Sequence, residues 1–139
     1  MAGDRLAFEC APDLAAAAAA GERAAAWVLA AGGSPRVAQR AALVVEEVLA
    51  NVASHGAGLA GSVASVRLAR RADALLIEID DAGRAFDPRG APVPDIGASL
   101  EDRPVGGLGL HLVRSLAERL EYRREGDRNS LSVTLRWEG

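Results

Sequence analysis

The chain has 139 residues, of which 50% are hydrophobic and 25% charged, a size and composition typical of one folded domain and too apolar for intrinsic disorder. Its net charge of -3 argues against direct contact with nucleic acid or an anionic membrane surface. All 16 basic residues are arginines, which excludes a P-loop, the eukaryotic type of protein kinase and a Schiff-base enzyme, because each of these needs a lysine.

The first elements along the chain are a strand and a helix. Residues 4–10 place Leu6, Phe8 and Cys10 on one face of a half-buried strand. An alanine-rich helix is predicted over residues 13–29, ahead of a pair of glycines. This run is not expected to cross a membrane, because charged residues interrupt it and alanine contributes little to insertion.

A second helix is predicted from Ser34 to His55. Ser34 supplies a capping hydroxyl and Pro35 suits the first helical position. Glycines at positions 56 and 58 end the helix. Its apolar residues recur at three- and four-residue spacing, so they form one buried stripe. These residues are Val37, Ala41, Val44, Val48 and Val52.

The second half of the chain predicts two hairpins separated by an irregular segment and a helix. Residues 80–105 lose periodicity and carry several prolines, which is typical of a functional loop. Leucines and valines at helical spacing then mark a third helix. The expected ranges are 63–70 and 75–79 for the first hairpin, 106–120 for the helix, and 120–124 and 131–137 for the second hairpin.

This order of elements indicates an α+β fold. Strands flank the helices without strict β-α-β alternation, which favours a two-layer sandwich with the helices on one face of a mainly antiparallel, mixed sheet. We find no repeat and no linker, so a single domain is predicted over residues 1–139. Cys10 is the single cysteine, and no export signal is recognisable, so we expect a cytoplasmic protein without a disulfide.

Three polar features stand out from this framework. Glu47, Asn51 and His55 are spaced four residues apart and project from one line of the second helix, beside the apolar stripe. This line is either a cleft wall or an ordinary polar helix edge. Glu46, the neighbour of Glu47, points about 100° away around the helix and is expected to face solvent or to pair with an arginine such as Arg40.

The other two features follow a strand and precede a helix. Asp81 ends an apolar strand, and Gly83 two residues later would let a flat ring approach the backbone. The alternative is a turn capped by an aspartate. The run 106–109, Gly-Gly-Leu-Gly, opens the third helix and offers backbone N–H groups to a phosphate, or forms only a tight turn.

Together, in this order and spacing, these features resemble the GHKL ATPases, also called the Bergerat-fold or HATPase_c family. Residues 47–51, Glu-Val-Leu-Ala-Asn, are similar to the N box. Residues 81–83, Asp-Ala-Gly, followed by Phe-Asp-Pro at 86–88, are similar to the G1 box, and residues 107–110, Gly-Leu-Gly-Leu, to the G2 box. The resemblance spans residues 5–137 and is strongest to the RsbW-type anti-sigma factor serine/threonine kinases.

The resemblance implies a Bergerat ATP-binding fold that binds ATP and Mg²⁺. Asn51 would be the Mg²⁺ ligand, Asp81 would accept the adenine amine, and Glu47 would act as the catalytic base. The usual second glycine of the G1 box is Ala85 in this chain, which would stiffen that turn or narrow the approach of the nucleotide. The predicted ATP-binding residues are Asn51, His55, Asp81, Gly83, Ala85, Arg103, Gly107, Leu108, Gly109 and Leu110. Residues 89–105 would be the ATP lid, in which Arg103 either meets a phosphate or is solvated.

The function implied by the resemblance is that of an ATP-dependent serine/threonine protein kinase that also sequesters a sigma factor. Its substrate would be an anti-anti-sigma protein with a STAS fold. One alternative is an ATP-binding module without catalysis, which Ala85 keeps open. Another is a histidine-kinase catalytic domain that acts in trans, since no histidine precedes His55. Homodimerisation is also compatible with the resemblance, with Leu6 and Phe8 as either contact or core residues.

Overall fold

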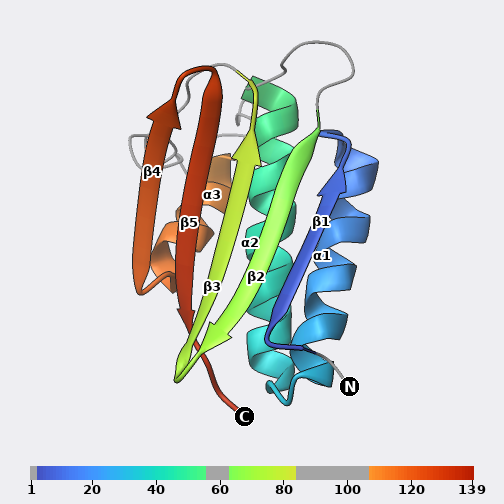
Figure 1. Ribbon diagram of the computed structural model, residues 1–139, viewed down its shortest axis with the longest axis vertical. Coiled ribbons are helices and arrows are strands. Elements are labelled where there is room, and N and C mark those ends of the chain that lie inside the picture. The colour runs from blue at the N-terminus through green and yellow to red at the C-terminus, as the bar shows by residue number, and fades with distance from the viewer. Residues whose placement is uncertain (1–2, 56–62, 84–106) are drawn as a thin grey trace.

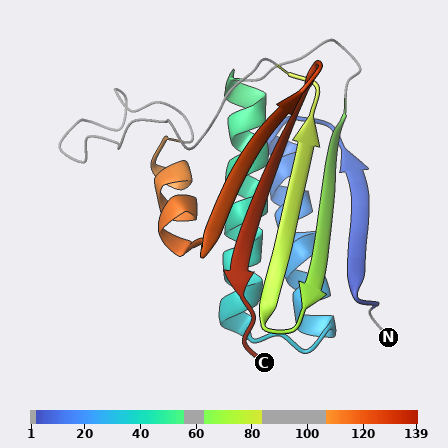
Figure 2. The ribbon, with the colours of Figure 1, turned by 60° about the vertical axis from the view of Figure 1, so that its left-hand side comes forward.

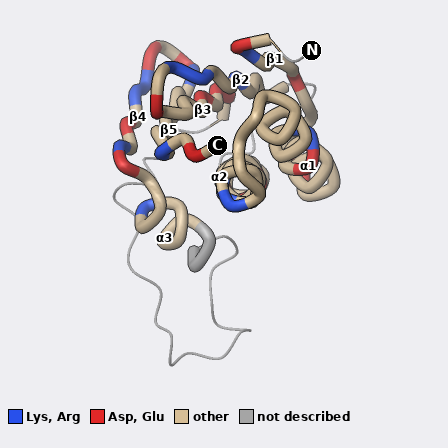
Figure 3. Tube along the Cα trace, turned by 90° about the horizontal axis from the view of Figure 1, so that it is seen from below, with Lys and Arg blue, Asp and Glu red and all other residues tan. Residues whose placement is uncertain are grey.

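The computed structural model describes residues 3–55, 63–83 and 107–139 and arranges them in two layers (Figure 1). An end-on view places all five strands in one layer and the three helices in the other (Figure 3). The predicted α+β sandwich with helices on one face is therefore confirmed. In chain order the elements are β1 (Arg5–Cys10), α1 (Leu14–Ala30), α2 (Pro35–His55), β2 (Ala64–Arg71), β3 (Ala74–Asp81), α3 (Gly107–Leu116), β4 (Arg119–Glu125) and β5 (Arg128–Arg136).

The strands form one sheet in the order β1-β2-β3-β5-β4. All four pairings among these strands are antiparallel, so the described sheet is not mixed as predicted. The two predicted hairpins, β2-β3 and β4-β5, are thus both present, and β3 and β5 join them. Figure 2 shows the sheet from its side, with the helices packed against one face and the other face uncovered.

The predicted cap at Ser34 is confirmed, and the first helix also begins at a capping residue, Asp13. The side chain of Asp13 caps α1 by accepting a hydrogen bond from the backbone N–H of Ala16 at 2.8 Å. The hydroxyl of Ser34 accepts one from Val37 N–H at 3.2 Å, directly before α2. These caps satisfy N–H groups that the helix itself leaves without a partner.

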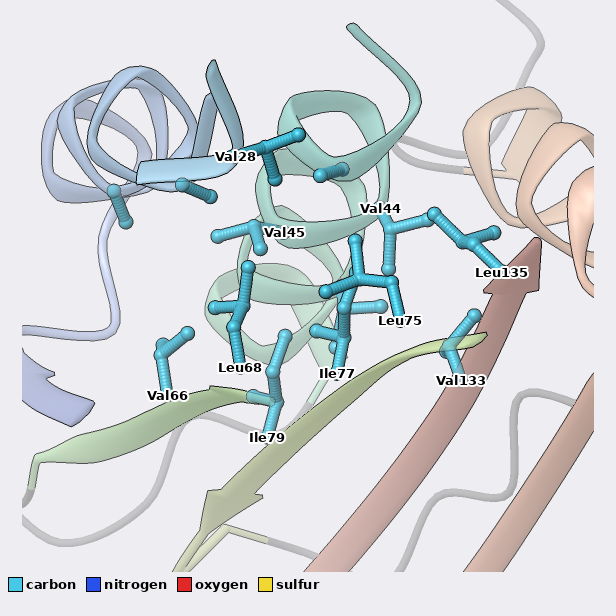
Figure 4. Close-up of a cluster of buried hydrophobic side chains, with 14 of the residues drawn as sticks. Val28, Val44, Val45, Val66, Leu68, Leu75, Ile77, Ile79, Val133 and Leu135 are labelled. Atoms are coloured by element: carbon cyan, nitrogen blue, oxygen red, sulfur yellow. The ribbon is translucent and has the colours of Figure 1, made fainter. Parts of the chain in front are cut away.

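The core lies between α1, α2 and the inner face of the sheet (Figure 4). Every residue of the predicted stripe on α2 is buried. Alternating residues of β2, β3 and β5 point towards it, as the period of two in a strand requires. The labelled core residues are Val28, Val44, Val45, Val66, Leu68, Leu75, Ile77, Ile79, Val133 and Leu135.

The two long helices approach each other closely at Gly21 of α1. A Cβ atom built on Gly21 would lie 2.8 Å from Cγ of Glu46 and 3.0 Å from the carbonyl oxygen of Ala42, both on α2. A side chain at this position would therefore require Glu46 and the backbone of Ala42 to move. The close contact holds α1 against α2, and α2 carries the first predicted motif.

The third helix is shorter than its apolar pattern predicted. α3 ends at Leu116, and Leu120 lies in β4, where it pairs with Val133 of β5. The N–H of Glu118 donates to the carbonyl of Thr134 at 2.8 Å, so the chain has already joined the sheet before Leu120. Leu120 fits both patterns, and pairing with β5 decides between them.

Leu6 and Phe8 of the edge strand β1 are partly buried and pack against the core. The guanidinium of Arg23 on α1 also lies 4.4 Å from the centre of the Phe8 ring. This packing supports the interpretation of Leu6 and Phe8 as core residues. Homodimerisation stays a prediction. Within the described ranges, no helix is long and apolar enough to cross a membrane.

Candidate functional site

The last two turns of α2 carry the first part of the candidate site. Asn51 is only 6% exposed, and Glu47, one turn earlier, is half-buried. A solvated helix edge would leave both side chains exposed, so the polar line borders the protein interior. Glu46 is exposed, as expected from its different direction around the helix.

The side-chain oxygen of Asn51 is buried and has no hydrogen-bond partner in the described part of the chain. Burying a polar atom without a partner costs about 1–3 kcal/mol, so such atoms are rare in folded proteins. An amide oxygen is also one of the neutral ligands that Mg²⁺ accepts. The unsatisfied oxygen therefore fits a metal or ligand contact at this position.

The carboxyl group of Glu47 has a raised pKa. Burial is the main cause, because it disfavours the charged form, and the negative charge of Glu46 adds to it. A raised pKa brings a carboxylate closer to the range in which it can take up a proton near neutral pH. This environment is compatible with the catalytic base that the resemblance implies.

The second part of the site is at the end of β3, where two adjacent aspartates point to opposite faces of the sheet. Asp81 continues the inward row of Ile77 and Ile79, and it is 7% exposed. Asp80 points to the uncovered face, where its carboxylate accepts a hydrogen bond from Arg67 at 3.1 Å. Of the two, Asp81 is therefore on the side of α2.

Both hydrogen bonds that the described residues make to Asp81 end on the same carboxylate oxygen. Oδ1 accepts from the backbone N–H of Gly83 at 2.8 Å and from the Nδ2 amide of Asn129 at 3.0 Å. The hydrogen bond from the N–H of Gly83 closes the turn after β3. The alternative prediction for this segment, a turn capped by an aspartate, is therefore correct for the local structure. Because Oδ1 is used, Oδ2 is the oxygen that remains for a ligand.

Sequence reasoning missed the residues that support Asp81 from the β4-β5 hairpin. Asn129 is directly opposite Asp81 in the pairing of β3 with β5, and Arg124 is opposite Asn129 in the pairing of β5 with β4. Arg124 donates to the carbonyl of Gly83 at 2.7 Å and to Oδ1 of Asn129 at 3.2 Å. Tyr122 also donates to Oδ1 of Asn129, at 2.5 Å. One signal was available: Asn129 is a polar residue in the inward phase of a strand whose other inward residues are apolar.

The third part of the site is the start of α3. The predicted glycine-rich residues Gly107, Leu108 and Gly109 form its first turn, which contains no acidic residue. The N–H groups of a first turn lack partners within the helix and carry a partial positive charge. Leu110 is 3% exposed, so its side chain anchors this turn in the protein. His111 is half-buried.

Two predicted residues, Ala85 and Arg103, lie outside the residues that the structure describes, as does the predicted lid. His55 is the last residue of α2, and its side chain is also outside them.

The described parts of the site lie towards one end of the molecule. α2 and β3 both run towards the upper end in Figure 1, where the turn between β4 and β5 also lies. α3 runs away from that end, so its first turn is directed towards it (Figure 2). α2 contacts both β3 and α3. Among the described residues, no group of three or more His, Cys, Asp or Glu side chains could hold a metal, so a cation here would rely on Asn51 and on ligand oxygens.

Comparison with known proteins gives two findings. Residues 10–137 match the model of the histidine kinase-like ATPase domain family. The chain is also 36% identical over 94 residues to the serine/threonine-protein kinase BtrW of Bordetella bronchiseptica. That alignment covers 66% of this chain and 66% of the kinase, slightly less than two thirds of each.

Proposed function

This chain belongs to the histidine kinase-like ATPase family, and from that premise we propose that it binds ATP with Mg²⁺ and phosphorylates a serine or threonine of a partner protein. The observation that carries the proposal is the pair on α2. Asn51 has a buried oxygen without a partner, and Glu47, one turn away, has a raised pKa. Neither feature benefits the folded protein alone.

Each of the three parts of the site would bind a different part of Mg²⁺-ATP. The free oxygen of Asp81 would accept the amino group of adenine, and the absence of a side chain at Gly83 would admit the flat ring. The first turn of α3 would bind the phosphates through its N–H groups, which makes a P-loop lysine unnecessary. Asn51 would hold Mg²⁺, which neutralises phosphate charge when it is bound.

The proposed reaction is a phosphoryl transfer in which Glu47 removes the proton. The hydroxyl oxygen of the acceptor forms a bond to the γ-phosphorus while the bond from that phosphorus to the β,γ-bridging oxygen breaks. The hydroxyl proton passes to the Glu47 carboxylate, and ADP leaves. A base of this kind contributes about 10²–10⁴-fold, and positioning and charge neutralisation supply the rest.

The proposed partners are a STAS-domain anti-anti-sigma protein as the substrate and a sigma factor as the sequestered protein. They follow from the resemblance of the three boxes to RsbW-type kinases. The name of the relative, a serine/threonine-protein kinase, supports a hydroxyl acceptor. It makes the histidine-kinase alternative less attractive.

The test is transfer of label from ATP labelled in its γ-phosphate to a STAS-domain protein of the same organism, in the presence of Mg²⁺. We expect acid-stable label on the acceptor and none on a variant whose acceptor serine is replaced by alanine. Nucleotide binding in calorimetry without any transfer would favour the non-catalytic binding module. Acid-labile label would instead favour transfer to histidine, and an absence of nucleotide binding would refute the site.

A further inference from the structure

A row of polar side chains crosses three strands on the helix-covered face of the sheet and joins Asp81 of the predicted G1 box to two residues outside the predicted boxes. Asp81 of β3 lies opposite Asn129 of β5 in the register of the sheet, and Asn129 lies opposite Arg124 of β4. Asn129 is only 6% exposed, although inward positions further along β5 are apolar. A buried amide in such a place needs partners, and the hairpin provides them.

The hydrogen bonds along this row have a fixed direction. A guanidinium has only donors, so the side-chain atom of Asn129 that faces Arg124 must be the amide oxygen. The amide nitrogen must then face Asp81, to which it donates at 3.0 Å. Tyr122 adds a second donor to the same amide oxygen and so strengthens the orientation. Asp81 is thereby held as an acceptor.

Arg124 also fixes the turn that follows Asp81. Its Nη1 atom donates to the carbonyl of Gly83 at 2.7 Å, and the N–H of Gly83 donates to Oδ1 of Asp81. The same guanidinium therefore orients both Asn129 and the backbone beside the proposed binding site of the nucleobase. Arg124 itself is an exposed residue, so this control comes from the surface of the hairpin.

We propose that Asn129, oriented by Arg124 and Tyr122, is a positioning residue that sets the nucleobase specificity of the site. It presents Oδ2 of Asp81 as an acceptor, so the site takes a purine with an amino group at position 6. A purine with a carbonyl there meets an acceptor opposite an acceptor. This inference rests on the proposed binding of ATP, and it adds residues of the β4-β5 hairpin to the determinants of which nucleotide is bound.

The experiment compares the affinities for ATP and inosine triphosphate, which differ in the group at position 6, by calorimetry with Mg²⁺. The variants are Arg124→Met and Tyr122→Phe, which change side chains at the edge of the row, and Asn129→Leu in its centre. We expect Arg124→Met and Asn129→Leu to weaken ATP binding about tenfold, with little effect on the binding of inosine triphosphate. The ratio of the affinity for ATP to that for inosine triphosphate should therefore fall. Tyr122→Phe should lower this ratio of affinities less, because Arg124 still orients the amide of Asn129.

The matched control is Arg123→Met. Arg123 is the adjacent arginine of the same strand, it pairs with Glu125 at 3.1 Å, and in the alternation of β4 it belongs to the opposite face. This variant should keep the wild-type ratio. Folding of each variant is checked by its circular dichroism and thermal midpoint, since a merely structural role would lower stability without changing the ratio.

The outcomes separate the two proposals. If the wild type binds ATP but folded Arg124→Met keeps the full preference for ATP over inosine triphosphate, the role of Asn129 and Arg124 is refuted and the nucleotide site stands. If the wild type binds neither nucleotide, the proposed function fails, and the inference that rests on it fails as well.

Discussion

Two buried asparagines with the same exposed fraction give a sensitive test of the site, because only one of them is satisfied. Asn51 and Asn129 are each 6% exposed. The oxygen of Asn51 has no partner among the described residues, whereas the amide of Asn129 both accepts and donates. Leucine has nearly the shape of asparagine without its polar atoms. The same substitution should therefore change stability in opposite directions at the two positions.

For Asn51→Leu, removing the unsatisfied oxygen should stabilise the ligand-free protein by about 1–2 kcal/mol. In a domain of this size the thermal midpoint should rise by roughly 3–8 °C. For Asn129→Leu, Asp81 loses a donor and two donors of the hairpin lose their acceptor. That variant should be destabilised by about 1–3 kcal/mol.

The assay is thermal and urea unfolding of both variants and the wild type without nucleotide, followed by ATP titration with Mg²⁺. Asn51→Leu should lose most of its affinity for Mg²⁺-ATP despite its higher stability. A protein that gains stability as it loses its ligand would show that Asn51 is retained for function. Equal destabilisation of the two variants would refute the reasoning, because it would mean that the Asn51 oxygen is satisfied in the folded protein.

Three further predictions concern the other residues of the site and its support. Asp81→Asn should weaken ATP binding at least about 100-fold in calorimetry, because the amide replaces a charged acceptor; unchanged affinity would contradict the base-site assignment. Glu47→Gln should bind ATP normally but transfer phosphate about 10²–10⁴ times more slowly, and the wild-type rate should fall as the pH drops through the raised pKa of Glu47. The pKa of Glu47 in the folded protein lies above its ordinary value of 4.5. Protonation of Glu47 therefore stabilises the folded protein. This stabilisation is complete below pH 4.5 and is lost as the pH rises through the pKa of the folded protein. Unfolding curves of Glu47→Gln should lack this dependence. Gly21→Val should destabilise the protein by about 1–3 kcal/mol in urea unfolding, since the added atoms meet Glu46 and Ala42; a neutral result would show that the two helices can separate at no cost.

The sequence alone predicted the order of the helices and strands and the apolar stripe of α2. The apolar stripe on α2 was recognisable because burial repeats with the period of the helix, and the cap at Ser34 because a capping hydroxyl precedes a proline at the first helical position. The N box likewise depends on a short spacing within one helix, whereas the G1 box starts at the last residue of β3 and extends beyond it along the sequence. Leu120 shows the limit of this approach, since its position suits a helix and a strand equally well.

Tertiary structure decided which polar groups meet. The contact between Asp81 and Asn129 joins residues 48 positions apart, and it exists because the register of β3 and β5 places them opposite each other. The same register turns Asp81 towards α2 and Asp80 towards Arg67. The unsatisfied oxygen of Asn51 is also a property of the packed protein. Hydrophobic period is set within one segment, but a partner for a polar atom is supplied by another segment, so only the assembled sheet and helices reveal it.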